Sequence, residues 1–286
     1  MRLSLGEKIF NIGNIVFLSA LGLVALYPFI FVLSSSVSDP NAIMQGRVWL
    51  YPVGFSLDAY ANILSRSDIW MGYANSVFFA VVGTAVNLVF TIAGAYPLSK
   101  ARLRGRVPLT LFVAFTMWFT AGMIPLYLTF VSYNLLDTRS ALIFGFAVTA
   151  FNFFILRTNF MSVPDSLEES AKLDGASDFT ILTKIYLPLS MAALATVGLF
   201  YFVGRWNAFF WSMVLIRDNN IVPLPVLLNQ LLIEASWGDD VVGDVVVTAD
   251  TLIHSTIVVA IIPMLLAFPI LQRYFVKGVM IGSVKG

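Results

Sequence analysis

The side chains of this sequence that could do chemistry are concentrated in one polar segment, 164–190, which reads PDSLEESAKLDGASDFTILTKIYLPLS. The absence of cysteine excludes disulfides, thiolate nucleophiles and thiolate metal sites. The single histidine, His254, cannot form a histidine metal cluster. The sequence also lacks the G-x-x-x-x-G-K-[ST] loop that cradles nucleotide phosphates. We therefore expect the polar segment to recognise another molecule, and we expect neither a metal site nor catalysis in this chain.

The local pattern of the polar segment predicts a helix, a break and a second helix. Pro164 ends the preceding element, and Asp165 with Glu168, or Ser166 with Glu169, matches a capping box at a helix start. The first helix is expected over about 167–173. The glycine at position 175 can then take the positive φ of a C-terminal cap.

The second helix of the segment is expected to begin after Ser177 as its N-cap and to continue towards Leu187-Pro188. Connections between helices usually take about 2 to 8 residues, so a segment of this length suggests a function. A rigid knob with small side chains fits a cleft on another protein. The small residues are Ser170, Ala171, Gly175 and Ala176.

The composition around this segment identifies an integral membrane protein. Hydrophobic residues make up 59% of the chain and charged residues 12%, against about 25% charged residues in soluble domains. The 286 residues suffice for about six spans of roughly 20 residues. We expect an all-α, single transmembrane domain over 1–286, with spans at about 10–33, 73–98, 108–131, 141–160, 188–216 and 251–275.

The distribution of lysine and arginine predicts the orientation. With six spans, 12 of the 17 basic residues lie on the side shared by both termini and the loop 164–187. By the positive-inside rule this side is the cytoplasm, and the loops 34–72 and 217–250 face outward. The cluster at 100–106 is expected to anchor the topology against anionic membrane lipid. The net charge of +1 gives no indication of nucleic-acid binding.

The polar segment resembles the EAA-x3-G-x9-I-x-LP motif of ABC importer permeases. The matching residues are Glu169, Ser170, Ala171, Gly175, Ile185, Leu187 and Pro188, with a serine in place of the usual central alanine. Trp206-Asn207 and the ending QRYFVKGVMIGSVKG are similar to the six-span carbohydrate-uptake permease of the maltose-permease type. The tail looks most like the subgroup that imports complex or acidic oligosaccharides such as alginate or pectin fragments.

This resemblance implies the type I ABC importer fold, with six transmembrane helices and a cytoplasmic coupling helix, in a bacterial cytoplasmic (inner) membrane. In that family a second, homologous permease completes the pathway, two ATPase subunits bind ATP and Mg, and a solute-binding protein delivers the sugar. This chain would be a non-catalytic subunit without a cofactor of its own. Closure of the ATPases is expected to move the coupling helix and switch the spans between inward-open and outward-open states.

The resemblance also implies sites for the partners. The ATPase-docking residues would be Glu169, Ser170, Ala171, Asp174, Gly175 and Ala176. A C-terminal tail between the ATPases would include Gly278, Gly282 and Lys285, although a frayed terminus is the simpler alternative. The outer loop 217–250, with an apolar stretch at 222–233 that could form a short helix, would reach the solute-binding protein or remain a solvated loop.

Polar and aromatic residues at membrane depth are candidates for an oligosaccharide pathway. They are Asn87, Trp118, Tyr127, Asn152, Arg205, Trp206 and Asn207. Each of these except Arg205 could instead make an interhelical hydrogen bond or lie at the membrane interface. Arg205 could pair with a uronate carboxylate, or it could extend to the outer interface or pair with an acid of the partner permease.

Two other classes of transporter remain open at this point. An ABC permease for an amino acid, phosphate or polyamine would share the motif but not the tail. An ion-coupled carrier would work without an ATPase, but the spans have no run of carboxylates for a proton relay.

Overall fold

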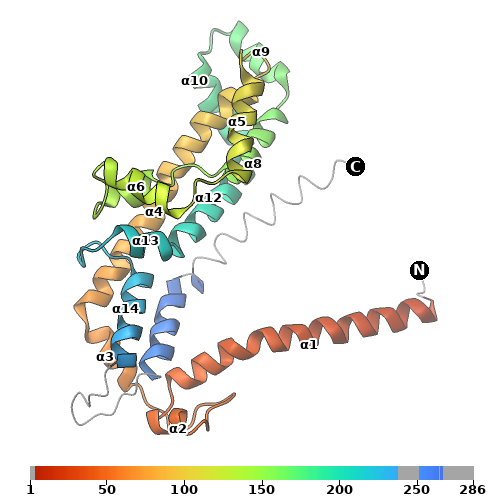
Figure 1. Ribbon diagram of the computed structural model, residues 1–286. Helices are drawn as coiled ribbons and strands as arrows, with labels where there is room; N and C mark the ends of the chain where they lie inside the picture. The colour runs from red at the N-terminus through yellow and green to blue at the C-terminus, as the bar shows by residue number, and fades with distance from the viewer. Residues whose placement is uncertain (1–3, 238–250, 264, 267–286) are drawn as a thin grey trace. The chain divides into compact units, whose positions relative to one another are not determined.

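The computed structural model describes residues 4–237, 251–263, 265 and 266, and every regular element within them is helical (Figure 1). The chain divides into two compact units. One comprises Met1–Ile69 and Leu228–Ile262, and the other comprises Trp70–Leu227 and Pro263–Gly286. Both the polar segment and the discontinuous helices described below belong to the second unit.

The first unit contains one long apolar helix, α1 (Leu5–Ser36). A capping box starts it, since Ser4 Oγ accepts a hydrogen bond from the Glu7 amide and Glu7 Oε2 accepts one from the Ser4 amide. Pro28 lies inside the helix and does not end it. Apolar side chains are exposed along α1, including Phe10 and Val24, which suits a helix surrounded by lipid.

Shorter elements complete the first unit: α2 (Pro40–Met44), α3 (Asp58–Ser65) and a helix over 251–263. The C-terminal end of α1 is held by side chains from α3 and from the helix over 251–263. Ser36 Oγ accepts a hydrogen bond from the Tyr60 hydroxyl at 2.7 Å, and the Ser36 carbonyl accepts one from Ser255 Oγ at 3.0 Å.

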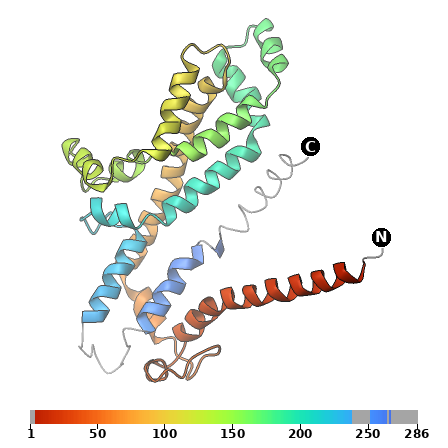
Figure 2. The same cartoon turned by 45° about the vertical axis from the view of Figure 1, so that its right-hand side comes forward.

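The second unit is built around α4 (Ser67–Ser99) and three discontinuous pairs of helices. The pairs are α5 (Arg106–Trp118) with α6 (Met123–Ser132), α7 (Arg139–Phe144) with α8 (Ala150–Met161), and α12 (Met191–Trp206) with α13 (Phe210–Leu215). Helix α8 packs against α5 and α12, and α7 packs against α13. Figures 1 and 2 show α8 beside α12.

By length and composition, two helices of the described part could cross a membrane, α1 and α4. The number rises to four if two bent pairs each form one span: α5 with α6, bent by 116°, and the helices on either side of Ser190, bent by 83°. Breaks also lie within the predicted spans 141–160 and 188–216. The division into six spans therefore stays a prediction.

Two apolar clusters hold the second unit together. The first joins α4, α8 and α12 to the polar segment, through the buried residues Ala95, Tyr96, Leu98, Phe153, Leu156, Phe160, Val163, Ile181, Tyr186, Val197 and Tyr201. The second packs α7 against α4, α6 and α13. Burial of each large apolar side chain contributes roughly 1.5–3 kcal/mol, so the polar segment is attached to the helices through Ile181 and Tyr186.

Candidate functional site

The polar segment forms the predicted helix, break and second helix. Helix α9 (Asp165–Leu173) is followed by Asp174 as its C-cap and then by Gly175, whose φ is +79°. Helix α10 (Asp178–Ile181) begins after Ser177, whose hydroxyl accepts a hydrogen bond from the Thr180 amide at 3.2 Å. The glycine turn and the Ser177 cap are thus confirmed. Figure 1 shows α9 and α10 together at one end of the second unit.

The predicted capping box at the start of α9 is wrong. Pro164 occupies the N-cap position, and no side chain caps the helix there. Glu168 cannot serve as the capping partner, because its carboxylate points inward and binds other elements. The helix starts without a side-chain cap, and Asp165 in its first turn complements the positive end of the helix dipole.

The segment continues into the membrane helix through an irregular path. A π-helix, η1 (Leu182–Tyr186), and one short turn, α11 (Leu187–Leu189), connect α10 to α12. The Leu187 amide bonds to the Leu182 carbonyl, one residue further back than in an α-helix. Pro188 comes next and has no amide hydrogen to continue an α-helical ladder. The helix axis then bends by 83° before Met191.

Glu168 is the centre of a buried ion-pair network. Its side chain is 8% exposed, and its two carboxylate oxygens accept hydrogen bonds from Lys100 Nζ and Lys172 Nζ. The Tyr186 hydroxyl donates a third bond at 3.0 Å, and Arg102 Nη1 lies at 3.4 Å. These partners come from the end of α4, from α9 itself and from η1, so one carboxylate joins three parts of the unit.

Burial by itself would raise the pKa of Glu168, but the hydrogen bonds from Lys100, Lys172 and Tyr186 outweigh it and lower the pKa to about 2. The carboxylate is therefore ionised at neutral pH. Because this pKa lies below its usual value of 4.5, the network stabilises the fold above about pH 4.5. Its contribution is lost as the pH falls towards 2.

The Lys100 ammonium is surrounded by aromatic rings as well as by Glu168. Its Nζ lies 3.4 Å from the ring centre of Tyr186 and 4.4 Å from that of Tyr96, which are cation–π distances. Desolvation lowers the pKa of Lys100 against the opposing effect of Glu168.

The second helix of the segment, α10, is bound to the loop between α4 and α5. Arg102 Nη2 donates a hydrogen bond to Asp178 Oδ1 at 2.6 Å. The basic cluster that the sequence assigned to membrane lipid therefore also holds α9 and α10 in place. Sequence reasoning missed this role, because nothing in the pattern links Lys100 to an acid 68 positions away. The spacing of Glu168 and Lys172, four residues apart on one helix, was the local signal.

The predicted docking residues divide into two environments. Glu169, Ser170, Asp174 and Gly175 are exposed, whereas Ala171 and Ala176 are half-buried and pack against the first apolar cluster. Two large apolar side chains are also exposed, Leu173 at 89% and Phe179 at 74%.

The predicted pathway residues do not share one environment. Trp118 and Asn207 are exposed, and Tyr127 is half-buried. Asn87, Asn152 and Trp206 are buried. The structure brings two of the seven together, since Arg205 Nη2 donates a hydrogen bond to Asn87 Oδ1 at 2.7 Å.

The guanidinium of Arg205 also donates hydrogen bonds to the carbonyls of Leu142, Ile143 and Phe146. The described contacts of the Arg205 guanidinium are therefore with the chain itself. The sequence offered three other partners, namely a uronate carboxylate, the outer interface and an acid of the partner permease, and these stay predictions.

Other predicted features fall at the edge of the described structure or beyond it. The tail residues Gly278, Gly282 and Lys285 and the loop residues 238–250 lie outside the described residues. The apolar stretch 222–233 does form a helix, α14 (Leu224–Trp237). No group of three or more metal-ligating side chains occurs within the part of the chain that the structure describes.

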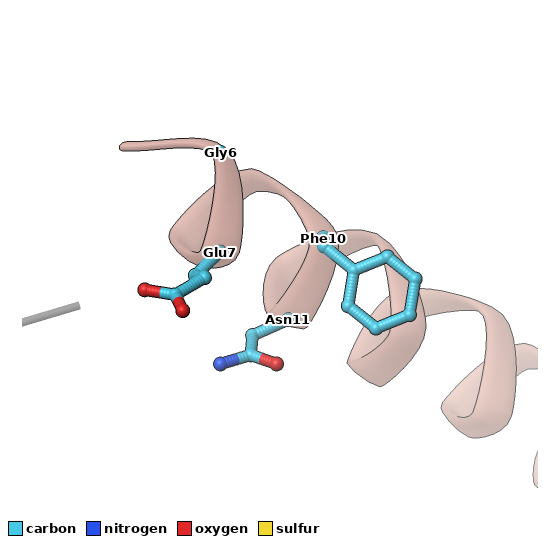
Figure 3. A pocket seen from close by; sticks show the side chains of 4 residues that line it. All are labelled: Gly6, Glu7, Phe10 and Asn11. Carbon is cyan, nitrogen blue, oxygen red and sulfur yellow. The ribbon is translucent and has the colours of Figure 1, made fainter. Parts of the chain in front are cut away.

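A shallow hollow lies near the start of α1, lined by Gly6, Glu7, Phe10 and Asn11. Figure 3 shows Glu7 and Asn11 one turn apart on the same side of this single helix. All four residues come from two turns of one element, so the hollow does not enclose a ligand.

Comparison with known proteins decides the class of this site. The family model described as the binding-protein-dependent transport system inner membrane component matches residues 69–281. The chain belongs to this family. It is therefore the membrane component of an ABC importer and not an ATPase, which confirms the predicted class and disfavours the ion-coupled carrier.

Among the relatives, Protein LplC of Bacillus subtilis is 39% identical over 282 residues, covering 98% of this chain and 96% of LplC. The polygalacturonan/rhamnogalacturonan transport system permease protein YtcP of the same species is 41% identical over 284 residues, covering 98% of this chain and 99% of YtcP.

Among solved structures, a chain of a bacterial ABC transporter involved in the import of the acidic polysaccharide alginate superposes with a TM-score of 0.91. It is 41% identical and covers 96% of this chain and 99% of its own length. A second alginate transporter chain, 14% identical with a TM-score of 0.59, shares the fold. The predicted all-α importer fold is thereby confirmed.

Proposed function

We propose that this chain is one of two permease subunits of an ABC importer that takes up oligosaccharides derived from acidic polysaccharides. The polar segment would be the coupling helix, facing the cytoplasm, on which an ATPase subunit docks. The proposal rests on one observation: α9 has an inner face that is fixed to the rest of the unit and an outer face that is exposed. Glu168 holds the inner face through its buried ion pairs, and Leu173 projects from the outer face into solvent.

This arrangement suits the transmission of force. A docking element must keep its position when a partner pushes or pulls on it, and the network around Glu168 connects α9 to α4 and to η1. Through η1 and α11 the segment leads directly into α12. Movement of an ATPase bound at α9 would therefore reach a membrane helix without an intervening flexible loop.

The outer surface combines two exposed apolar side chains with exposed carboxylates. Leu173 and Phe179 stand on either side of the Gly175 turn, with Glu169 and Asp174 exposed nearby. Apolar anchors that become fully desolvated usually supply most of an interface's free energy, whereas exposed charges supply orientation. We infer that the two apolar side chains enter the ATPase cleft and that Glu169 and Asp174 fix the orientation.

The substrate class is supported by the relatives. YtcP is named for polygalacturonan and rhamnogalacturonan, and the similar solved transporter imports the acidic polysaccharide alginate. Both names point to polysaccharides that carry carboxylates. We infer that this importer takes up a uronate-containing oligosaccharide delivered by an extracytoplasmic solute-binding protein.

Other parts of the assembly follow from the same proposal. The loop 217–250 would contact the solute-binding protein, and the tail with Gly278, Gly282 and Lys285 would reach between the two ATPases. Trp206 and Asn207 would line the sugar pathway together with Asn152, Tyr127 and Trp118. Both termini would lie in the cytoplasm.

The proposal is tested by uptake into proteoliposomes that contain the complete importer and its solute-binding protein. Oligogalacturonides and alginate oligosaccharides are compared with neutral maltooligosaccharides of equal length. We expect ATP-dependent uptake of at least one acidic series, at a rate about tenfold or more above the neutral series. Uptake of neutral sugars alone would refute the acidic substrate, and uptake of an amino acid or phosphate alone would refute the sugar class.

A further inference from the structure

The segment between α7 and α8 is a break in a helix at expected membrane depth. Helix α7 ends at Phe144, and α8 begins after its N-cap residue, Thr149. The last carbonyls of a helix have no amide partner within the helix. In a membrane such groups must be satisfied by the protein itself, because no water is available to them. The free backbone groups of 142–149 therefore need hydrogen-bond partners from other parts of the protein.

Arg205 satisfies the carbonyls at the C-terminal end of α7. Its Nη1 donates to the Leu142 carbonyl, and its Nη2 donates to the carbonyls of Ile143 at 2.9 Å and Phe146 at 3.0 Å. A planar guanidinium with several donors in a fixed geometry can serve several carbonyls at once, whereas an ammonium acts as a single point charge. The positive charge also lies at the helix end that carries the partial negative charge.

Tyr201 satisfies the other side of the break. It lies four residues before Arg205 and so occupies the same face of α12. Its hydroxyl accepts a hydrogen bond from the Thr149 amide at 3.2 Å. One face of α12 thus binds the carbonyls that end α7 and an amide that begins α8.

Helix α4 supports both side chains with a matching pair of its own. Asn87 Oδ1 accepts from Arg205 Nη2 at 2.7 Å, and Thr91 Oγ1 lies 2.7 Å from the Tyr201 hydroxyl. Asn87 and Thr91 are buried and also lie four residues apart on one helix. Two side-chain pairs therefore connect α4 to α12: Asn87 with Arg205, and Thr91 with Tyr201. Each pair also contacts the break through its residue on α12.

The backbone of α4 comes close to the Arg205 side chain at a glycine. A Cβ atom on Gly83 would lie 3.0 Å from Arg205 Nε and 3.2 Å from its Cδ. The missing side chain at position 83 leaves room for the stem of Arg205. This close approach is a second observation that Arg205 is built into the interior of the unit.

We propose that Arg205, Tyr201, Asn87 and Thr91 form a clamp that fixes the α7–α8 break to α4 and α12 and moves it together with α12. Arg205 is then a positioning residue, and its guanidinium is engaged by the chain's own carbonyls and not by the sugar. The transmission of movement from the coupling helix through α12 to the break rests on the proposed function. The clamp itself does not, because its contacts lie within this chain.

The direct test is hydrogen–deuterium exchange over peptides that cover 142–152, measured on the complete importer in lipid nanodiscs. Arg205→Lys keeps the charge but carries three donors on one nitrogen in place of five on a planar fork, so it cannot serve three carbonyls and Asn87 at once. We expect exchange there to become about tenfold faster or more. Tyr201→Phe should accelerate exchange at the start of α8 alone. Arg47→Lys, at an exposed arginine after α2, is the matched control and should leave these peptides unchanged.

Two further variants keep the test decisive if Arg205→Lys fails to assemble. Tyr201→Phe removes a single oxygen. Gly83→Ala places a methyl group against Arg205 Nε and Cδ and so displaces that side chain without changing any charge. Both should accelerate exchange within 142–152. Wild-type exchange in Arg205→Lys, or in both of these variants, would overturn the clamp.

Uptake measured on the same variants separates positioning from contact with the sugar. The clamp predicts that Arg205→Lys and Arg205→Gln lower the maximal uptake of every transported sugar by a similar factor, about tenfold, with little change in half-saturation. A contact between Arg205 and a carboxylate predicts that Lys is tolerated and that Gln raises the half-saturation for acidic sugars alone. That second pattern, with unchanged exchange, would overturn the proposal and leave the function of the importer standing.

Discussion

At the scale of single residues, two neighbouring glutamates of α9 have opposite environments. Glu168 is buried and ion-paired, while Glu169 is exposed. The motif assigned importance to Glu169 and treated Glu168 as a capping residue. The structure shows that Glu168 determines where the helix sits, and it leaves Glu169 free to meet a partner. The two residues are therefore expected to fail in different ways when they are changed.

Glu168→Gln should destabilise the polar segment by about 3 kcal/mol, because it leaves the buried Lys100 ammonium without its counter-charge. The measurement is hydrogen–deuterium exchange over 165–190 in the detergent-solubilised importer. Glu169→Gln is the matched control: it should keep wild-type exchange and instead weaken ATPase binding. Equal protection in both variants would show that the ion pairs around Glu168 do not hold the segment.

Gly175 is required for its backbone conformation and not for space. Its φ is +79°, and a Cβ atom at this position would have none of the described atoms within 4 Å. A left-handed residue other than glycine costs roughly 1–2 kcal/mol, and asparagine tolerates this conformation better than alanine. Gly175→Ala should therefore reduce sugar-stimulated ATPase activity more than Gly175→Asn, although asparagine is larger. The reverse order would mean that the ATPase cleft, and not the turn, requires the glycine.

At the scale of elements, the proposed docking surface belongs to a helix, a turn and a second helix that are packed together on the first apolar cluster. Leu173 ends α9 and Phe179 lies in the first turn of α10, so their relative position depends on the Gly175 turn. Behind them, Ile181 and Tyr186 anchor the segment in the apolar cluster. Substitution at the exposed face should consequently affect docking without unfolding the segment.

Leu173→Asp should lower the affinity of the permease for its ATPase subunits by about tenfold or more, since it places a charge where an apolar anchor is desolvated. The side chain is 89% exposed in this chain, so the thermal stability of the permease should change little. Co-purification and light scattering of the assembled complex measure the effect. Ser162→Asp, which adds the same charge just before the segment, is the control. Equal loss in the two variants would contradict a specific role for Leu173.

At the scale of the whole molecule, the orientation in the membrane is a prediction from the charge distribution. The natural chain contains no cysteine, so single cysteines can be introduced without a background. Arg104→Cys, in the exposed turn between α4 and α5, should react with a membrane-impermeant maleimide only from the cytoplasmic side. Tyr51→Cys, 71% exposed in the loop 34–72, should react only from outside. Labelling of both positions from one side would refute the predicted topology.

The sequence by itself determined the membrane class, the helix–break–helix shape of 164–190 and the family motif. These features depend on composition and on interactions between residues close in the chain, such as the Ser177 cap and the positive φ of Gly175. Local patterns of this kind are visible in a sequence because turns and caps use residue types with particular backbone preferences.

Only the tertiary structure decided which polar residues are partners. Lys100 meets Glu168, Arg205 meets carbonyls 59 to 63 positions before it, and Asn87 meets Arg205 across 118 positions. The structure also revealed breaks inside predicted spans, such as the one between α7 and α8. The hydropathy of this stretch is that of a continuous apolar run. The break does not show in it, because the side chains that hydrogen-bond to the free backbone groups belong to other helices.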